Sequence, residues 1–177
     1  LSHQIVIEQM MKLSFDKPVR HMREYLSVLG PLIHQRNVSF DGETLGAQAA
    51  IDVPNAEPCP ILVAALGPKM LELAGQMADG TITWMTGANT LADHTIPTIN
   101  AAADAAGRPK PRIIASVPVC VTNDVDHARA RAAKALVAYG FLPSYRAMLD
   151  REGLEGPADL AIIGDEDTVR AGIEAYA

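Results

Sequence analysis

The feature that most constrains this chain is a regular alternation of apolar, strand-like runs with helical segments. The strand-like runs lie at 60–66, 81–85, 112–122 and 160–163. The segments between them repeat their apolar residues with the period of a helix. Strands and helices that alternate at a spacing of about 30 residues predict parallel βαβ units. Right-handed crossovers then place the helices outside the sheet.

Two α/β architectures satisfy this pattern, an open doubly wound sheet and a (β/α)8 barrel. The chain has no G-x-G-x-x-G segment, so the dinucleotide fingerprint of a Rossmann sheet is missing. A complete barrel takes about 250 residues, whereas this chain has 177. On the barrel interpretation, the predicted strands amount to about half of the eight that a barrel requires.

Local signals predict where the other elements begin and end. A helical period covers 3–13, and Asp16-Lys17-Pro18 predicts the start of a helix that runs to about His34. The glycine- and proline-rich segment 37–58 is interpreted as a long excursion with a short hairpin near 39–42. Helices are further predicted at 68–78, from about 90 to 106, after Asn123-Asp124 and at 144–151.

The two ends of the sequence favour a piece of a longer domain. The chain starts at Leu1, and its last predicted helix, which begins at 164–167, reaches Ala177 without a glycine or proline stop signal. The alternative is a natural terminus with a frayed last helix.

The composition excludes two classes of partner. The chain carries 15 basic and 21 acidic residues, a formal charge of −6, and has no cluster of lysines and arginines to follow a phosphate backbone. Nucleic acid is therefore not predicted as a partner. The longest apolar runs, such as 61–66, are too short to cross a bilayer, so no membrane partner is predicted either.

The cysteines and the N-terminus predict a cytoplasmic location. Cys59 and Cys120 lie far apart in sequence and outside any C-x-x-C pair, so we expect two reduced, buried thiols. The N-terminus also lacks the basic region and apolar stretch of a secretory signal.

The end of the first predicted strand, Ala64 to Lys69, has the features of an anion-binding loop. Small residues let the backbone approach a ligand, and Gly67 is expected to permit a tight turn. The helix that follows points its free N–H groups and the positive end of its dipole at the loop, which suits a phosphate. Pro68 has no N–H group, but a donor is dispensable in the first turn. The alternative is a plain turn in which Gly-Pro only marks the helix start.

The second strand ends at Trp84, the only tryptophan, followed by Thr86 and Gly87. Thr86 and Gly87 could line a pocket or bind phosphate; the alternative is a loop that merely needs small residues. Trp84 is expected in the core rather than as a ligand platform.

The five histidines show no metal-binding spacing, so no metal site is predicted. Four of them are expected on solvated helix faces: His21, His34, His94 and His127. His3 follows Ser2 at the start of the chain, where a position in the pocket stays open.

The segment 60–87, PILVAALGPKMLELAGQMADGTITWMTG, strongly resembles the luciferase-like monooxygenase superfamily. It is most similar to the branch of oxidoreductases that use the deazaflavin coenzyme F-420. Other matching pieces are Ser2-His3 and the runs LSFDKPVRHMREYLSVL, PVCVTND and LPSYRAMLDREG. The likeness extends over essentially the whole chain.

This resemblance implies a (β/α)8 TIM-barrel fold, of which residues 1–177 would be one incomplete domain that lacks several N-terminal strands and the last strand. It also implies which residues bind the cofactor. One loop would hold the cofactor phosphate through backbone N–H groups, a second would lie beside the cofactor tail or the substrate, and a third would lie near the cofactor. These loops correspond to Ala64, Ala65, Leu66, Gly67 and Pro68, to Thr86 and Gly87, and to Ser2 and His3.

The resemblance further implies hydride transfer between coenzyme F-420 and a small organic substrate, with the cofactor supplying the chemistry. The family's proton-transferring residues mostly follow early strands, so no catalytic residue is assigned. The alternatives are an FMN-dependent monooxygenase of the same superfamily and a non-catalytic flavin-binding relic. A homodimer is the expected assembly.

Overall fold

The computed structural model describes residues 3–177 as a series of helices and strands that form three separate sheets. The α-helices are α1 (Pro18–Gln35), α2 (Pro68–Met77), α3 (Ala88–Thr90), α4 (Ile96–Ala105), α5 (Val125–Leu136), α6 (Pro143–Glu152) and α7 (Glu166–Glu174). Short π-helical turns occur at η1 (Val6–Met10) and η2 (Leu91–Thr95), and 3-10 turns at η3 (Val137–Phe141) and η4 (Pro157–Leu160). The strands are β1 (Asn37–Asp41), β2 (Gly46–Ala50), β3 (Leu62–Val63), β4 (Gly80–Trp84), β5 (Arg112–Ser116), β6 (Val119–Val121) and β7 (Ile162–Gly164).

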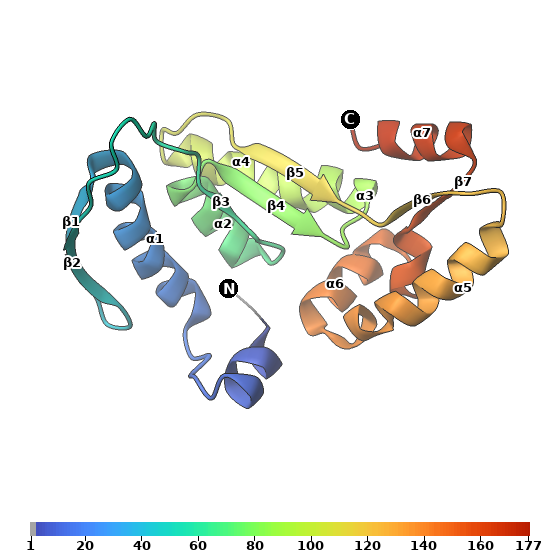
Figure 1. Cartoon of the computed structure of the whole chain (residues 1–177), viewed down its shortest axis with the longest axis horizontal. Coiled ribbons are helices and arrows are strands. Elements are labelled where there is room, and N and C mark those ends of the chain that lie inside the picture. The colour runs from blue at the N-terminus through green and yellow to red at the C-terminus, as the bar shows by residue number, and fades with distance from the viewer. Residues whose placement is uncertain (1–2) are drawn as a thin grey trace.

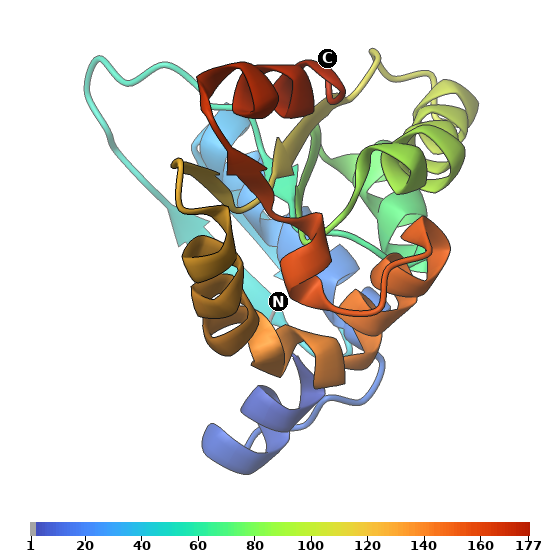
Figure 2. The same cartoon turned by 90° about the vertical axis from the view of Figure 1, so that its right-hand side faces the viewer.

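The predicted parallel βαβ units are present. β3, β4 and β5 form a parallel sheet in that order, β6 and β7 form a second parallel pair, and β1 and β2 form an antiparallel hairpin. In Figure 1 the β3–β4–β5 sheet occupies the middle of the molecule, with α2 and α4 along it. Figure 2 shows α5 and α7 flanking the β6–β7 pair. Among residues 3–177 the strands do not close into a barrel.

The main core lies between the β3–β4–β5 sheet and the helices on one side of it. Buried apolar side chains of β3, α1, α2 and α4 pack there, among them Leu26, Val63, Leu71 and Ile99. α2 and α4 approach closely at Gly75, where a Cβ atom would lie 2.9 Å from the Cβ of Ala102. The helix positions are therefore set by tight packing beneath the sheet.

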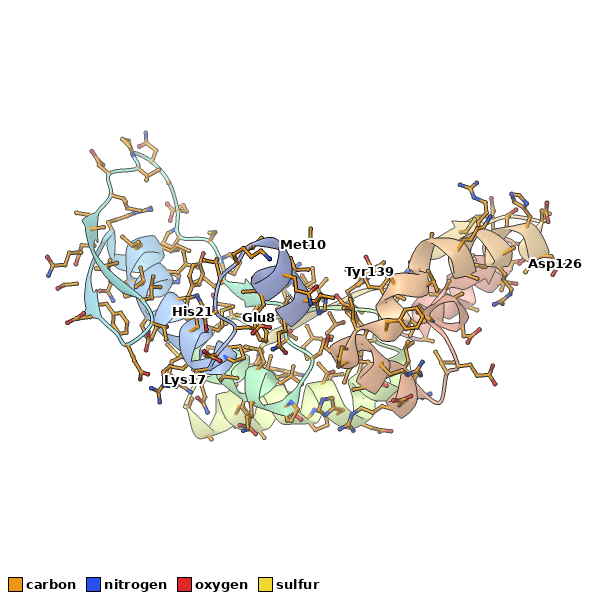
Figure 3. The ribbon with its side chains drawn as sticks, turned by 90° about the horizontal axis from the view of Figure 1, so that it is seen from below. Glu8, Met10, Lys17, His21, Asp126 and Tyr139 are labelled. Atoms are coloured by element: carbon orange, nitrogen blue, oxygen red, sulfur yellow. The ribbon has the colours of Figure 1, made fainter. Side chains whose placement is uncertain are left out.

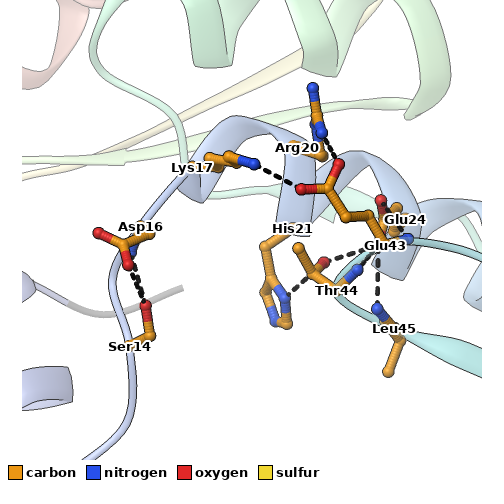
Figure 4. A network of polar contacts seen from close by, with 9 residues as sticks. All are labelled: Ser14, Asp16, Lys17, Arg20, His21, Glu24, Glu43, Thr44 and Leu45. Carbon is orange, nitrogen blue, oxygen red and sulfur yellow. Dashed lines mark hydrogen bonds and ion pairs between the residues drawn. The ribbon is translucent and has the colours of Figure 1, made fainter.

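The β1–β2 hairpin is anchored to α1 by one buried carboxylate. Glu24 accepts hydrogen bonds from the backbone N–H groups of Glu43, Thr44 and Leu45 and from the Thr44 hydroxyl, at 3.1, 2.6, 2.9 and 2.6 Å (Figure 4). These bonds, with the Thr44 hydroxyl bond the largest contribution, hold the pKa of Glu24 below its ordinary value. His21 Nδ1 lies 3.1 Å from the Thr44 hydroxyl oxygen. The predicted hairpin is confirmed, and this network holds its turn in place.

Three expectations were wrong in detail. The predicted strand 112–122 is split, because Pro118 has no N–H group for a ladder; its carbonyl instead accepts from Ile162 at 2.9 Å. β5 consequently pairs with β4, whereas β6 pairs with β7. The first predicted strand is reduced to β3 because it has only one neighbour, β4. Both thiols, Cys59 and Cys120, are exposed and not buried: Cys59 lies in the exposed segment 51–60, and Cys120 lies on the thinly covered strand β6.

Candidate functional site

A cleft of about 790 Å³ lies at the carboxyl ends of the β3–β4–β5 sheet. The strand ends contribute the loop 64–67, Trp84 and Ser116. The other walls come from the N-terminal segment and from residues 141–145. Figure 3 shows that segment, labelled at Glu8 and Met10, between α1 and the turn labelled at Tyr139. Ligands of parallel α/β proteins bind at this end of the strands.

The loop 64–67 leads directly into α2, whose N-terminus opens on the cleft. The backbone N–H groups of Met70 and Leu71 donate to the Gly67 carbonyl at 3.1 and 3.0 Å, so Gly67 is the N-cap. No side chain caps this helix, and within residues 3–177 the N–H groups of Gly67 and Lys69 have no hydrogen-bond partner. Free N–H groups at a helix N-terminus favour an anion, both as donors and through the helix dipole.

Gly67 leaves room for such an anion. Its φ of −75° and ψ of 154° are open to any residue, so the backbone at this position does not depend on the conformational freedom of glycine. A Cβ atom built at this position meets nothing within 4 Å. The space that a side chain would fill is therefore free beside the donors, and the loop fits a phosphate group.

His94 was expected on a solvated helix face, but it is buried. It is 8% exposed, and its Nε2 atom lies 2.9 Å from the carbonyl oxygen of Leu66. The residue belongs to the π-turn η2, between α3 and α4, and thus reaches the loop 64–67 from a different element. η2 continues into α4, which packs against α2, and this packing buries His94; its isolated position in the sequence did not reveal it.

A row of aromatic rings runs along the cleft from the N-terminal segment to β4. His3 packs against Tyr145 with ring centroids 5.0 Å apart, Tyr145 against Tyr139 at 5.2 Å, and Tyr139 against Trp84 at 5.9 Å. His3, Tyr145 and Trp84 line the cleft. Trp84 is half-buried: it packs against the core cluster of Met85, Leu149 and Leu160, as expected, and it also forms part of the cleft wall. Ser2, the other predicted residue of the first loop, lies outside the described residues.

The Ser144 and Tyr145 hydroxyl groups add polar atoms to this aromatic row. His3 Nδ1 lies 3.4 Å from the Ser144 hydroxyl oxygen, which ties the N-terminal segment to the start of α6. Burial raises the pKa of the Tyr145 hydroxyl above its ordinary value, and the neighbouring Tyr139 adds to the rise. A phenol is already neutral near pH 7, and the raised pKa extends that neutral range to higher pH.

Thr86 and Gly87 are not brought to the cleft. Thr86 is fully buried, and its hydroxyl donates to the Trp84 carbonyl at 3.3 Å. The helix that begins after Gly87 is already capped by the Glu152 carboxylate, which accepts from the Thr90 N–H at 2.8 Å and the Thr90 hydroxyl at 2.6 Å. This N-terminus is therefore occupied by a side chain of the chain itself, and the role predicted for Thr86 and Gly87 stays a prediction.

Several residues of the cleft were missed by sequence reasoning. Ser116 ends β5, whereas Phe141 and Ser144 lie around the break between η3 and α6. Phe141 is 81% exposed and forms part of the cleft wall. The Gly-Phe-Leu-Pro segment marks a break in the helix, but nothing local indicates that this break lines the same cleft as the ends of β3 and β4.

In the part of the chain from 3 to 177, no group of three or more histidine, cysteine or acidic side chains is placed to hold a metal ion. No helix of the described chain combines the length and the apolar character that a bilayer span requires.

The sequence matches the luciferase-like monooxygenase family over residues 2–177. The chain belongs to this family. Similar proteins include a 5,10-methylenetetrahydromethanopterin reductase of Methanolobus tindarius, which is 30% identical over 155 residues, 87% of this chain and 47% of the relative. An F-420-dependent glucose-6-phosphate dehydrogenase of Nakamurella multipartita is 30% identical over 149 residues, 82% of this chain and 42% of the relative.

Membership of the luciferase-like family agrees with the architecture. A solved F-420-dependent secondary alcohol dehydrogenase, in complex with an F-420–acetone adduct, superposes with a TM-score of 0.74 at 21% identity. The match covers 96% of this chain and 56% of that protein. The predicted α/β fold of luciferase-like TIM-barrel type is confirmed. The chain spans about half the length of the curated relatives it matches, 47% and 42% in the two cases above.

Proposed function

We propose that the protein is an oxidoreductase that binds the deazaflavin coenzyme F-420 in the cleft and exchanges hydride with a small organic substrate. The observation that carries the proposal is the loop 64–67, where unpaired N–H groups and the open space at Gly67 face a cleft at the strand ends. Family membership and the F-420-dependent relatives support the choice of cofactor.

In this proposal the backbone of Ala64, Ala65, Leu66 and Gly67, with Pro68 starting α2, holds the cofactor phosphate. Coenzyme F-420 would supply the hydride chemistry from its deazaflavin ring. The protein's own part is to bind the anionic end, orient the rest of the molecule and exclude water. The aromatic row from His3 to Trp84 provides the apolar wall for this, and the Tyr145 phenol provides a neutral donor beside it.

A second candidate is an FMN-dependent monooxygenase, and the observation that favours it is the family itself, which is named for luciferase-like monooxygenases. The two cofactors share a phosphate and a three-ring system, so the same loop suits both. Their absorbance separates them, because a deazaflavin absorbs in the violet and a flavin in the blue.

The test is a titration of the purified protein with coenzyme F-420 and, separately, with FMN, followed by the fluorescence of Trp84. This residue is the only tryptophan of the chain and lines the cleft, so a bound ring quenches it directly. Quenching that saturates with F-420 supports the first proposal, and saturation with FMN alone supports the second. Binding of neither cofactor would refute both.

A further inference from the structure

The loop that is proposed to bind the cofactor phosphate is held from behind by a histidine. His94 Nε2 lies 2.9 Å from the Leu66 carbonyl oxygen. A carbonyl oxygen only accepts hydrogen bonds, so the imidazole carries its proton on Nε2 in this contact. Leu66 and Gly67 line the cleft, whereas His94 does not. The histidine therefore contacts the loop from the side of the helices and not from the side of a ligand.

The hydrogen bond between His94 and the Leu66 carbonyl also sets the direction in which the Gly67 N–H group points. The peptide bond between Leu66 and Gly67 is trans and planar, so the Leu66 carbonyl and the Gly67 N–H point in opposite directions. Because the carbonyl is turned toward His94, the N–H of Gly67 is turned away from it, toward the cleft. A flipped peptide would instead present a carbonyl oxygen to the anion, which would repel it.

We propose that His94 is a positioning residue that fixes the Leu66–Gly67 peptide so that the Gly67 N–H is ready to bind the phosphate of the cofactor. This inference rests on the proposed function and goes beyond it, because it assigns a role to a residue that does not touch the ligand. Its burial supports the role: at 8% exposure the imidazole has little freedom to turn away, and water has little access to replace it.

The experiment compares His94→Phe, which removes the donor but keeps a planar ring, with His94→Gln, whose amide nitrogen can take the place of Nε2. Each variant is titrated with coenzyme F-420 and with its phosphate-free deazaflavin riboside, or with FMN and riboflavin if the wild type prefers a flavin. A hydrogen bond to a charged group contributes enough that His94→Phe should weaken the phosphate-bearing cofactor about tenfold. Affinity for the phosphate-free compound should change less than about twofold, because its binding does not depend on the Gly67 N–H.

Restoration of most of the lost affinity by His94→Gln completes the expected result. Equal losses for the phosphate-bearing and the phosphate-free compound would overturn the inference, since they would show that His94 merely supports the fold. Unchanged affinity in both variants would overturn it as well. If the wild type binds none of the four compounds, the proposed function itself fails, and that outcome is visible before any variant is made.

A measurement on the wild-type protein covers the case in which His94→Phe does not fold. A long-range ¹H–¹⁵N spectrum reports the tautomer of His94, which must be protonated on Nε2. Addition of the phosphate-bearing cofactor must then move the Gly67 amide proton downfield, whereas the phosphate-free compound must not. A proton on Nδ1 alone, or a Gly67 amide that responds equally to both compounds, contradicts the proposal.

Discussion

Substitution of Gly67 by aspartate should stabilise the fold and weaken cofactor binding at the same time. Gly67 is the N-cap of α2, and its backbone conformation and free surroundings accept a side chain without strain. Aspartate is a better N-cap than glycine, because its carboxylate accepts from the N–H groups of the first turn. The gain is about 0.5 kcal/mol, or a rise in Tm of about 1 to 2 °C for a chain of this size.

The same carboxylate occupies the donors that a phosphate would use and adds a negative charge beside it. Two unit charges 4 Å apart repel by about 1 kcal/mol in water and about 4 kcal/mol at a protein surface of lower effective dielectric constant. Gly67 is exposed, so the lower part of this range applies. A loss of about 1 to 2 kcal/mol corresponds to a Kd that rises about 5- to 30-fold.

The assay combines thermal unfolding with the Trp84 titration at low and high salt. Gly67→Asn is the matched control, since it has the size and capping ability of aspartate without the charge. The excess loss in Gly67→Asp over Gly67→Asn should shrink as salt screens the repulsion. A folded Gly67→Asp protein with unchanged cofactor affinity would refute the assignment of this loop to the phosphate.

Other residues give independent checks of the fold. Gly75→Ala should lower the stability by about 1 to 3 kcal/mol in urea unfolding, because the added methyl meets the backbone of α4. Glu24→Gln should make the free energy of unfolding depend less on pH in acid. The pKa of Glu24 is lowered in the folded protein, so its carboxylate stabilises the fold above the ordinary carboxyl pKa. This contribution is lost as the pH falls through the lowered pKa. An unchanged pH dependence would contradict the anchor at the hairpin. Glu152→Gln should reduce Tm through a loss of about 0.5 to 2 kcal/mol at the cap of the helix after Gly87, and an unaltered Tm would show that this cap contributes little.

Elements that depend on neighbours in sequence could be predicted closely. Pro68, which lacks an N–H group, opens α2 as expected. Asp124 and Asp165 cap α5 and α7 through bonds to residues three positions later, at 3.2 and 2.9 Å. Each signal acts over one helical turn, so no knowledge of the remaining structure was needed to interpret it.

Residues whose surroundings come from distant segments were the ones misjudged. His94 is polar and lies in a segment with an ordinary helical pattern. Helix packing brings it into contact with Leu66, which is 28 positions away in the sequence. The loop at Thr86 and Gly87 is followed by a helix start that Glu152, 62 positions from Thr90 in the sequence, already caps; the cofactor role of these two residues stays a prediction. Such contacts depend on how helices pack, which local pattern does not encode.

By itself, therefore, the sequence determined the order of strands and helices, the resemblance to luciferase-like proteins and the loop at 64–67, because periodicity, capping and small residues are local properties of the chain. Only the tertiary structure decided that, among residues 3–177, no group pairs with the first N–H groups of α2, whereas Glu152 caps the helix after Gly87. It also decided that Trp84 and Phe141 line the same cleft. The reason is that a donor's availability depends on every group that folding brings within hydrogen-bond distance of it.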